Sequence, residues 1–129
     1  MPLERFVLID DNEADNFFHR LAIERAGFTG EILVFERPQD GLAFLVDDGI
    51  SRSTCVLLDI SMPQMSGFDV ARALTAALHP RAPLAVHLLS SSDWREDRAR
   101  AAEIPLISQY RVKPLRTPDV QTLLAAWPA

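Results

Sequence analysis

The chain has 129 residues, enough for one domain with a substantial core, and its 48% hydrophobic and 24% charged residues are typical of a globular protein. With 13 Lys and Arg against 18 Asp and Glu, its net charge is −5, which disfavours direct binding to nucleic acid. A single cysteine, Cys55, excludes an internal disulfide, and no apolar run reaches membrane-spanning length. We therefore expect a cytoplasmic protein that binds neither nucleic acid nor a membrane.

Short apolar runs recur along the chain at intervals long enough to hold a helix. The predicted strands cover residues 6–9, 32–35, 55–58, 84–89 and 106–112. Their apolar residues are nearly continuous, which is typical of parallel strands covered on both faces.

Helix signals stand between the runs. Asn12 can cap a first helix that stops at Gly27, and Pro38 suits the first turn of a second helix. The apolar stripe of that second helix comprises Leu42, Leu45 and Val46.

The remaining helices have their own boundary signals. A third helix ends before Pro80, and Asp93 with Glu96 predicts a capping box that opens a fourth. Thr117 before Pro118 predicts the cap of a fifth. Five strands alternating with five helices imply crossover connections, and so an α/β fold with a parallel sheet.

Polar residues follow four of the five predicted strands. Asp10 and Asp11 follow the first strand, Asp59 the third, Ser90 the fourth and Lys113 the fifth. Because ligands of open parallel sheets bind beyond the carboxyl ends of the strands, we expect these side chains to converge at one edge.

Such a cluster indicates phosphoryl chemistry. Clustered carboxylates need a cation to stay ionised together, and an all-oxygen set suits Mg²⁺. An aspartate oxygen can then attack a metal-held phosphoryl group, while a lysine and a serine hydroxyl stabilise the charge on that group.

Four segments taken together resemble the receiver (CheY-like) domains of two-component response regulators, of the stand-alone type. The segments are VLIDDNEADN, LLDISMPQMSGFD, LLSSSD and YRVKPL. The resemblance implies a flavodoxin-like doubly wound (βα)5 fold, with a five-stranded parallel sheet in the order 2-1-3-4-5. It also implies one receiver domain over residues 1–129 without an output domain.

The same resemblance assigns roles around the metal. Asp59 corresponds to the phosphoacceptor, and Asp10 and Asp11 to the metal-binding pair, with Asp11 the more direct ligand. The backbone carbonyl of Ser61 completes the metal ligands, and Mg²⁺ is the expected ion, with Mn²⁺ as a substitute.

Further roles fall at the ends of the fourth and fifth strands. Lys113 corresponds to the signalling lysine of the family, and a cis bond is expected between it and Pro114. The hydroxyl position is Ser90 or Ser91, with Ser90 favoured as the first polar residue after the strand, and Tyr110 corresponds to an aromatic switch.

The expected function is that of a phosphoacceptor switch. A sensor histidine kinase or a histidine phosphotransfer protein donates the phosphoryl group, and the surface of the fourth helix, fifth strand and fifth helix signals to a downstream protein. The chain is expected to be a monomer or weak dimer, and to catalyse only its own phosphotransfer and dephosphorylation.

Two alternative functions belong to other classes of protein. A pseudo-receiver would act as an interaction module without phosphorylation. A haloacid-dehalogenase-like phosphatase needs a second aspartate two residues after its nucleophile, but Asp10 is followed by Asp11 and Asn12. The three histidines have no metal-site spacing and are expected to be structural: His19, His79 and His87.

Overall fold

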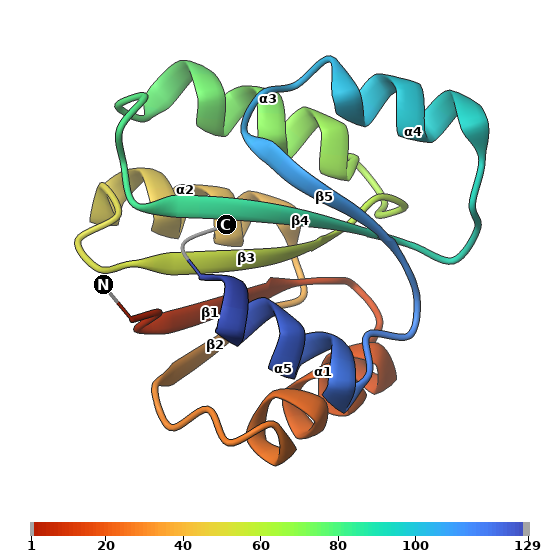
Figure 1. Ribbon diagram of the computed structural model, residues 1–129. Helices are drawn as coiled ribbons and strands as arrows, with labels where there is room; N and C mark the ends of the chain where they lie inside the picture. The colour runs from red at the N-terminus through yellow and green to blue at the C-terminus, as the bar shows by residue number, and fades with distance from the viewer. Residues whose placement is uncertain (1, 128–129) are drawn as a thin grey trace.

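The computed structural model describes residues 2–127 as a central sheet with helices on both faces (Figure 1). The elements in chain order are β1 (Arg5–Ile9), α1 (Glu13–Arg25), β2 (Glu31–Phe35), α2 (Pro38–Asp48), β3 (Thr54–Asp59), α3 (Gly67–Ala77), β4 (Leu84–Ser90), α4 (Arg95–Ala102), β5 (Ile107–Val112) and α5 (Thr117–Ala126).

The sheet has five strands in the order β2-β1-β3-β4-β5, and every neighbouring pair is parallel. The predicted flavodoxin-like (βα)5 fold and its strand order are therefore confirmed. Chain order reverses beside β1, and such a switch point opens a crevice at the carboxyl ends of β1 and β3.

Alternating residues of each strand build two core layers. In β1, Phe6 and Leu8 pack with the layer under α1 and α5, whereas Val7 and Ile9 pack with the layer under α2, α3 and α4. Figure 1 shows α1 and α5 on one side of the sheet and α3 and α4 on the other. Burial on both faces explains why the strands are continuously apolar.

The predicted strands are confirmed with shifts of one residue at some ends. The largest surprise is Arg5, a buried charged residue that begins β1. Its guanidinium donates to Asp48 Oδ2 at 2.7 Å and to Thr54 Oγ1 at 3.0 Å. A buried charge is tolerated when it is paired and hydrogen-bonded in this way.

The first helix begins as predicted, because the Asn12 side chain accepts the Asp15 N–H at 3.1 Å. Pro38 opens α2, also as predicted. The predicted stripe of α2 is only partly buried: Leu45 is fully buried, but Val46 is 40% exposed on the solvent side.

Two capping predictions were wrong. The carboxylate of Asp93 pairs with the side chain of Arg98, so it does not cap α4, and Trp94 stands at the N-cap instead. At α5 the N-cap is Arg116, one residue earlier than predicted, and Thr117 is already helical. The Arg116 N–H donates to the carboxylate of Asp119 in the first turn.

Helix α4 is the most polar of the helices, with the sequence REDRARAA. Ala101 is its one buried residue, and Ile104 beyond its end adds a second apolar contact with the core. Two arginines also contact aromatic rings, Arg98 at 4.7 Å from the Tyr110 centroid and Arg100 at 4.2 Å from that of Phe68. None of the helices within residues 2–127 combines the length and the apolarity needed to cross a membrane.

Candidate functional site

Three aspartates meet where β1 and β3 end. Asp10 directly follows β1 and Asp59 is the last residue of β3, and both are buried, whereas Asp11 is exposed. One carboxylate oxygen from each lies within 4.8 Å of the others. Within residues 2–127 this is the one group of three such side chains arranged to hold a metal ion.

Asp10 is held by the turn between β1 and α1. Its N–H donates to the Phe35 carbonyl at 3.1 Å, which continues the ladder with β2. Its Oδ1 accepts the Asn12 N–H at 2.9 Å, and its carbonyl accepts the Asn16 side-chain amide at 2.8 Å. The carboxylate is therefore oriented before any ligand arrives.

Asp59 is held by a close approach between β3 and α3. The Gly67 N–H donates to the Ile60 carbonyl at 2.9 Å. A Cβ atom at Gly67 would lie 2.4 Å from the Asp59 carbonyl oxygen, far inside contact distance. Glycine is thus required at the start of α3 for the helix to pack against the phosphoacceptor candidate.

Lys113 enters the cluster from the end of β5. Its N–H donates to the Ser90 carbonyl at 2.7 Å, and its bond to Pro114 is cis, as predicted. Its Nζ lies 2.8 Å from Asp10 Oδ2 and 3.0 Å from Asp59 Oδ1. Asp10, Asp59 and Lys113 thus converge at the strand ends, as predicted from their positions in the sequence.

A third carboxylate, which was not predicted from the sequence, also contacts the lysine. Asp15 Oδ2 lies 2.8 Å from Lys113 Nζ. Asp15 stands in the first turn of α1, and the direction of its side chain depends on how that helix is rotated over the sheet. The sequence carries no local signal for this rotation.

Negative charge exceeds positive charge at the cluster, because three carboxylates contact the single Lys113 ammonium group and Asp11 adds a fourth carboxylate beside Asp10 and Asp59. Burial, together with the negative charge of Asp10, raises the pKa of Asp59 to about 6, although Lys113 opposes this shift. Burial alone would lower the pKa of Lys113, but hydrogen bonds to Asp10, Asp15 and Asp59 raise it above its ordinary value.

A hard cation relieves this repulsion, and the donor atoms fit one. The carboxylate oxygens of Asp10, Asp11 and Asp59 are the ligand type that Mg²⁺ prefers, and exposed Asp11 leaves room for its water ligands. Ser61, the other predicted ligand, lies in the β3–α3 loop two residues after Asp59.

The serines differ in environment. Ser90 is the buried last residue of β4, one position beyond the rung that pairs Leu89 with Asp59. Its Oγ accepts the Ser92 N–H at 3.1 Å, whereas Ser91 is exposed. Of the two open candidates, Ser90 has the more fixed position at the strand end.

Tyr110 lies beside the loop that follows Ser90. It pairs with Leu88 in the sheet, and its Oη donates to the Ser92 carbonyl at 2.8 Å. The tyrosine ring therefore has a direct hydrogen bond to the β4–α4 loop.

His19 and Cys55 lie in structural positions. His19 is buried and accepts the Leu115 N–H at 3.3 Å, and burial, helped by the charge of Lys113, lowers its pKa. Burial also raises the pKa of the Cys55 thiol, which disfavours a nucleophilic role.

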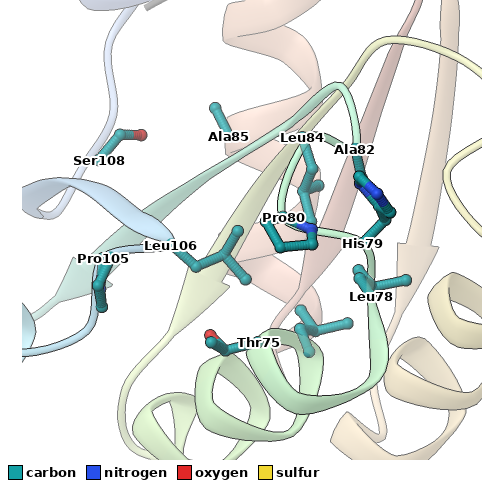
Figure 2. A pocket seen from close by; sticks show the side chains of 11 residues that line it. Thr75, Leu78, His79, Pro80, Ala82, Leu84, Ala85, Pro105, Leu106 and Ser108 are labelled. Carbon is teal, nitrogen blue, oxygen red and sulfur yellow. The ribbon is translucent and has the colours of Figure 1, made fainter.

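A separate cavity of about 330 Å³ lies at the other end of the strands, where β4 and β5 begin. Figure 2 shows its lining side chains, which come from the end of α3, the α3–β4 loop, the beginning of β4 and the residues around the beginning of β5. Leu78, Pro80, Leu84 and Leu106 make it mainly apolar, and His79 is its one titratable residue. It takes no part in the acidic cluster.

Comparisons with known proteins agree with this geometry. No family model matches the chain. It is 34% identical over 122 residues to the probable methanogenesis regulatory protein FilR2 of Methanothrix harundinacea, covering 89% of this chain and 75% of that protein. It is 28% identical to the two-component response regulator ORR1 of rice, covering 97% of this chain and only 55% of that protein.

Solved structures show the same fold. A two-component response regulator from Cytophaga hutchinsonii superposes with a TM-score of 0.84 at 25% identity, covering 95% of both chains. A response regulator receiver protein from Dyadobacter fermentans does so with a TM-score of 0.83 at 27% identity, covering 96% of this chain and 97% of that one. With the strand order and the aspartate cluster, these similarities show that the chain belongs to the receiver domains of two-component response regulators.

Proposed function

We propose that this receiver domain accepts a phosphoryl group on Asp59 from the phosphohistidine of a histidine kinase or a histidine phosphotransfer protein. The main support for this proposal is the position of the buried Asp59 carboxylate. Its Oδ1 lies 3.0 Å from Lys113 Nζ, and a carboxylate oxygen of Asp59 lies within 4.8 Å of oxygens of Asp10 and Asp11. Asp10 has the same neighbours, but its Oδ1 accepts the Asn12 N–H and its Oδ2 accepts a hydrogen bond from Lys113 Nζ. Asp59 instead contacts Lys113 through Oδ1 and keeps its second oxygen for the phosphoryl group.

The proposed transfer is a displacement at phosphorus. A carboxylate oxygen of Asp59 forms a bond to phosphorus, the bond from phosphorus to the donor's histidine nitrogen breaks, and the imidazole leaves with a proton. The Lys113 ammonium and the Ser90 hydroxyl donate to phosphoryl oxygens, and bound Mg²⁺ supplies positive charge that neutralises the group. Attack of water at phosphorus later releases phosphate and restores Asp59.

The proposed output passes through Ser90 and Tyr110 to the surface of α4, β5 and α5. Ser90 Oγ now accepts from the Ser92 N–H, and the Ser92 carbonyl accepts from Tyr110. When the Ser90 hydroxyl turns to the phosphoryl group, the loop must adjust and the tyrosine loses or changes its partner. A two-state surface is biased in this way by one local hydrogen bond.

Other parts of the proposal rest on family membership. The domain catalyses only its own phosphotransfer and dephosphorylation, and Mn²⁺ can substitute for Mg²⁺. The molecule works in the cytoplasm as a monomer or weak dimer. A protein target receives the signal, and nucleic acid and membrane are not partners.

Labelling with acetyl phosphate and magnesium tests the central step. Mass spectrometry after a mild acid quench should show one added phosphoryl group in the wild type and none in Asp59→Asn. Asp47→Asn, which removes an exposed acid of α2, should label normally as the matched control. Full labelling of a folded Asp59→Asn protein would refute the assignment, and no labelling of the wild type by acetyl phosphate or a kinase would favour an unphosphorylated interaction module.

Tyr110 gives the readout for the switch because it is the single tyrosine of the chain. In a tyrosine-labelled sample, its NMR signal should shift on phosphorylation of the wild type. Ser90→Ala should still accept the phosphoryl group but leave the tyrosine signal near its unphosphorylated position. An equal shift in Ser90→Ala would remove Ser90 from the proposed route.

A further inference from the structure

We propose that Asp15 is a positioning residue for Lys113, and that it holds the ammonium group so that one N–H faces Asp59. This inference rests on the proposed phosphoryl transfer, but its structural part can be tested in the unphosphorylated protein. Neither the metal cluster nor the phosphoacceptor assignment includes Asp15.

The first observation that supports this role of Asp15 is the match between the donors of Lys113 and the acceptors around it. A lysine ammonium has three N–H donors and no acceptor. Three carboxylates lie within hydrogen-bond distance of Nζ: Asp10 Oδ2 at 2.8 Å, Asp15 Oδ2 at 2.8 Å and Asp59 Oδ1 at 3.0 Å. Asp10 and Asp15 accept hydrogen bonds from the ammonium group, which leaves one donor for Asp59, and the contact to Asp59 is the longest.

The second step is that Asp15 holds the lysine from the solvent side. The side chain of Asp15 is 34% exposed, whereas those of Asp10 and Asp59 are 4% and 8% exposed. The Lys113 side chain, itself 14% exposed, lies between these inner carboxylates and the outer one. With two carboxylates on the inner side and one on the outer side, the ammonium group is restrained from swinging outward.

Asp15 is itself fixed by the start of α1. Its N–H donates to the Asn12 side chain at 3.1 Å, which places it in the first helical turn. The ion pair therefore joins α1 to the end of β5, across 98 residues of sequence. A rigid helix turn is a better support for a functional side chain than a free loop.

Asp15 differs from Asp10 in one further way. Asp10 belongs to the group of carboxylates arranged to hold a cation, and Asp15 does not. Asp15 is therefore the partner that can keep Lys113 while the other two carboxylates engage a metal ion or a phosphoryl group. The third N–H is then free to move from Asp59 to a phosphoryl oxygen without the ammonium group leaving the site.

NMR tests the restraint directly, because Lys113 is the single lysine of the chain. With ¹⁵N-labelled lysine, the wild type should give one ammonium signal protected from exchange with water. That signal should broaden or disappear in Asp15→Asn and return in Asp15→Glu, whose carboxylate can still reach Nζ. Glu13→Gln is the matched control, because Glu13 is an exposed acid of the same helical turn, and its signal should equal that of the wild type.

Kinetics tests the consequence for transfer. At saturating magnesium, Asp15→Asn should label with acetyl phosphate about five to ten times more slowly than Glu13→Gln, as expected when one orienting contact is lost. Asp15→Glu should recover most of the rate. Labelling of Asp15→Asn that is as fast as or faster than the control would show that Asp15 competes for the lysine, and would overturn the inference.

The two proposals fail in different ways. If the wild type takes no label from any donor, the proposed function is wrong, and the ammonium signal alone decides whether Asp15 holds Lys113. If the wild type is labelled at Asp59 but the ammonium signal of Asp15→Asn is unchanged, the inference about Asp15 is wrong and the proposed function stands.

Discussion

Replacing Asp59 with asparagine should make the metal-free protein more stable at neutral and alkaline pH. The wild-type carboxylate is buried beside Asp10, and the pKa of Asp59 rises from 3.8 to about 6. The folded protein therefore disfavours the ionised form of this side chain. Asparagine has nearly the same shape and carries no charge, so the variant avoids this unfavourable state.

The raised pKa gives both the size and the sign of the effect. A change from 3.8 to about 6 is about 2 pKa units, and at 1.36 kcal/mol per unit it corresponds to about 3 kcal/mol. Between these two pH values the folded state binds the proton more tightly than the unfolded state does. Wild-type stability therefore falls as pH rises from about 4 to about 6, and the whole loss is present above that range.

Part of this gain should be lost, because asparagine is a weaker partner for Lys113 than a carboxylate is. We expect a net stabilisation of about 1–3 kcal/mol near pH 8, shrinking toward zero near pH 4. Urea unfolding in the presence of a chelator measures both values, with Asp47→Asn as the control for removal of an exposed acid. Equal stability of variant and wild type near pH 8, or a difference that persists near pH 4, would refute the reasoning.

Three further substitutions test other parts of the structure. Asp11→Asn should bind Mg²⁺ at least about tenfold more weakly by calorimetry while its metal-free fold stays intact, and unchanged affinity would remove Asp11 from the ligand set. Gly67→Ala should lower the free energy of unfolding by about 2–4 kcal/mol and slow labelling, since its Cβ meets the Asp59 carbonyl, and wild-type stability would contradict the close approach. Asp48→Asn should cost roughly 1 kcal/mol near pH 7 after solvent screening, because the hydrogen bond from Arg5 lowers the pKa of Asp48 to about 2. The difference should fade as the pH falls from about 4 to about 2, and a difference constant over that range would exclude this ion pair as the cause.

The fold was predictable because its signals are local. Continuous apolar runs mark strands covered on both faces, and Asn12 and Pro38 mark helix starts through their own backbone preferences. The start of β1 was not predictable, because the buried Arg5 is neutralised by Asp48, which lies 43 residues away. At α4, the capping signal of Asp93 was overridden by an ion pair that sequence spacing does not reveal.

The site was predictable to the extent that strand ends determine it. In a parallel sheet the carboxyl ends of β1, β3 and β5 lie on the same side, so the proximity of Asp10, Asp59 and Lys113 could be predicted from the sequence. Asp15 reaches the same lysine from a helix, and its direction depends on how α1 is rotated over the sheet. The rotation of α1 could not be read from its apolar residues, because two of them, Phe17 and Phe18, are exposed in the structure and do not face the sheet.

The weak apolar anchoring of α4 has a consequence for how the molecule opens. With Ala101 its one buried residue and arginines in contact with Tyr110 and Phe68, α4 loses little buried apolar surface when it detaches. Strand β3, buried at every residue, opens only when both core layers separate. Local unfolding free energies in proteins range from near zero to the global value. We expect α4 near the lower limit and β3 near the upper one, so amide hydrogens of α4 should exchange with solvent long before those of β3.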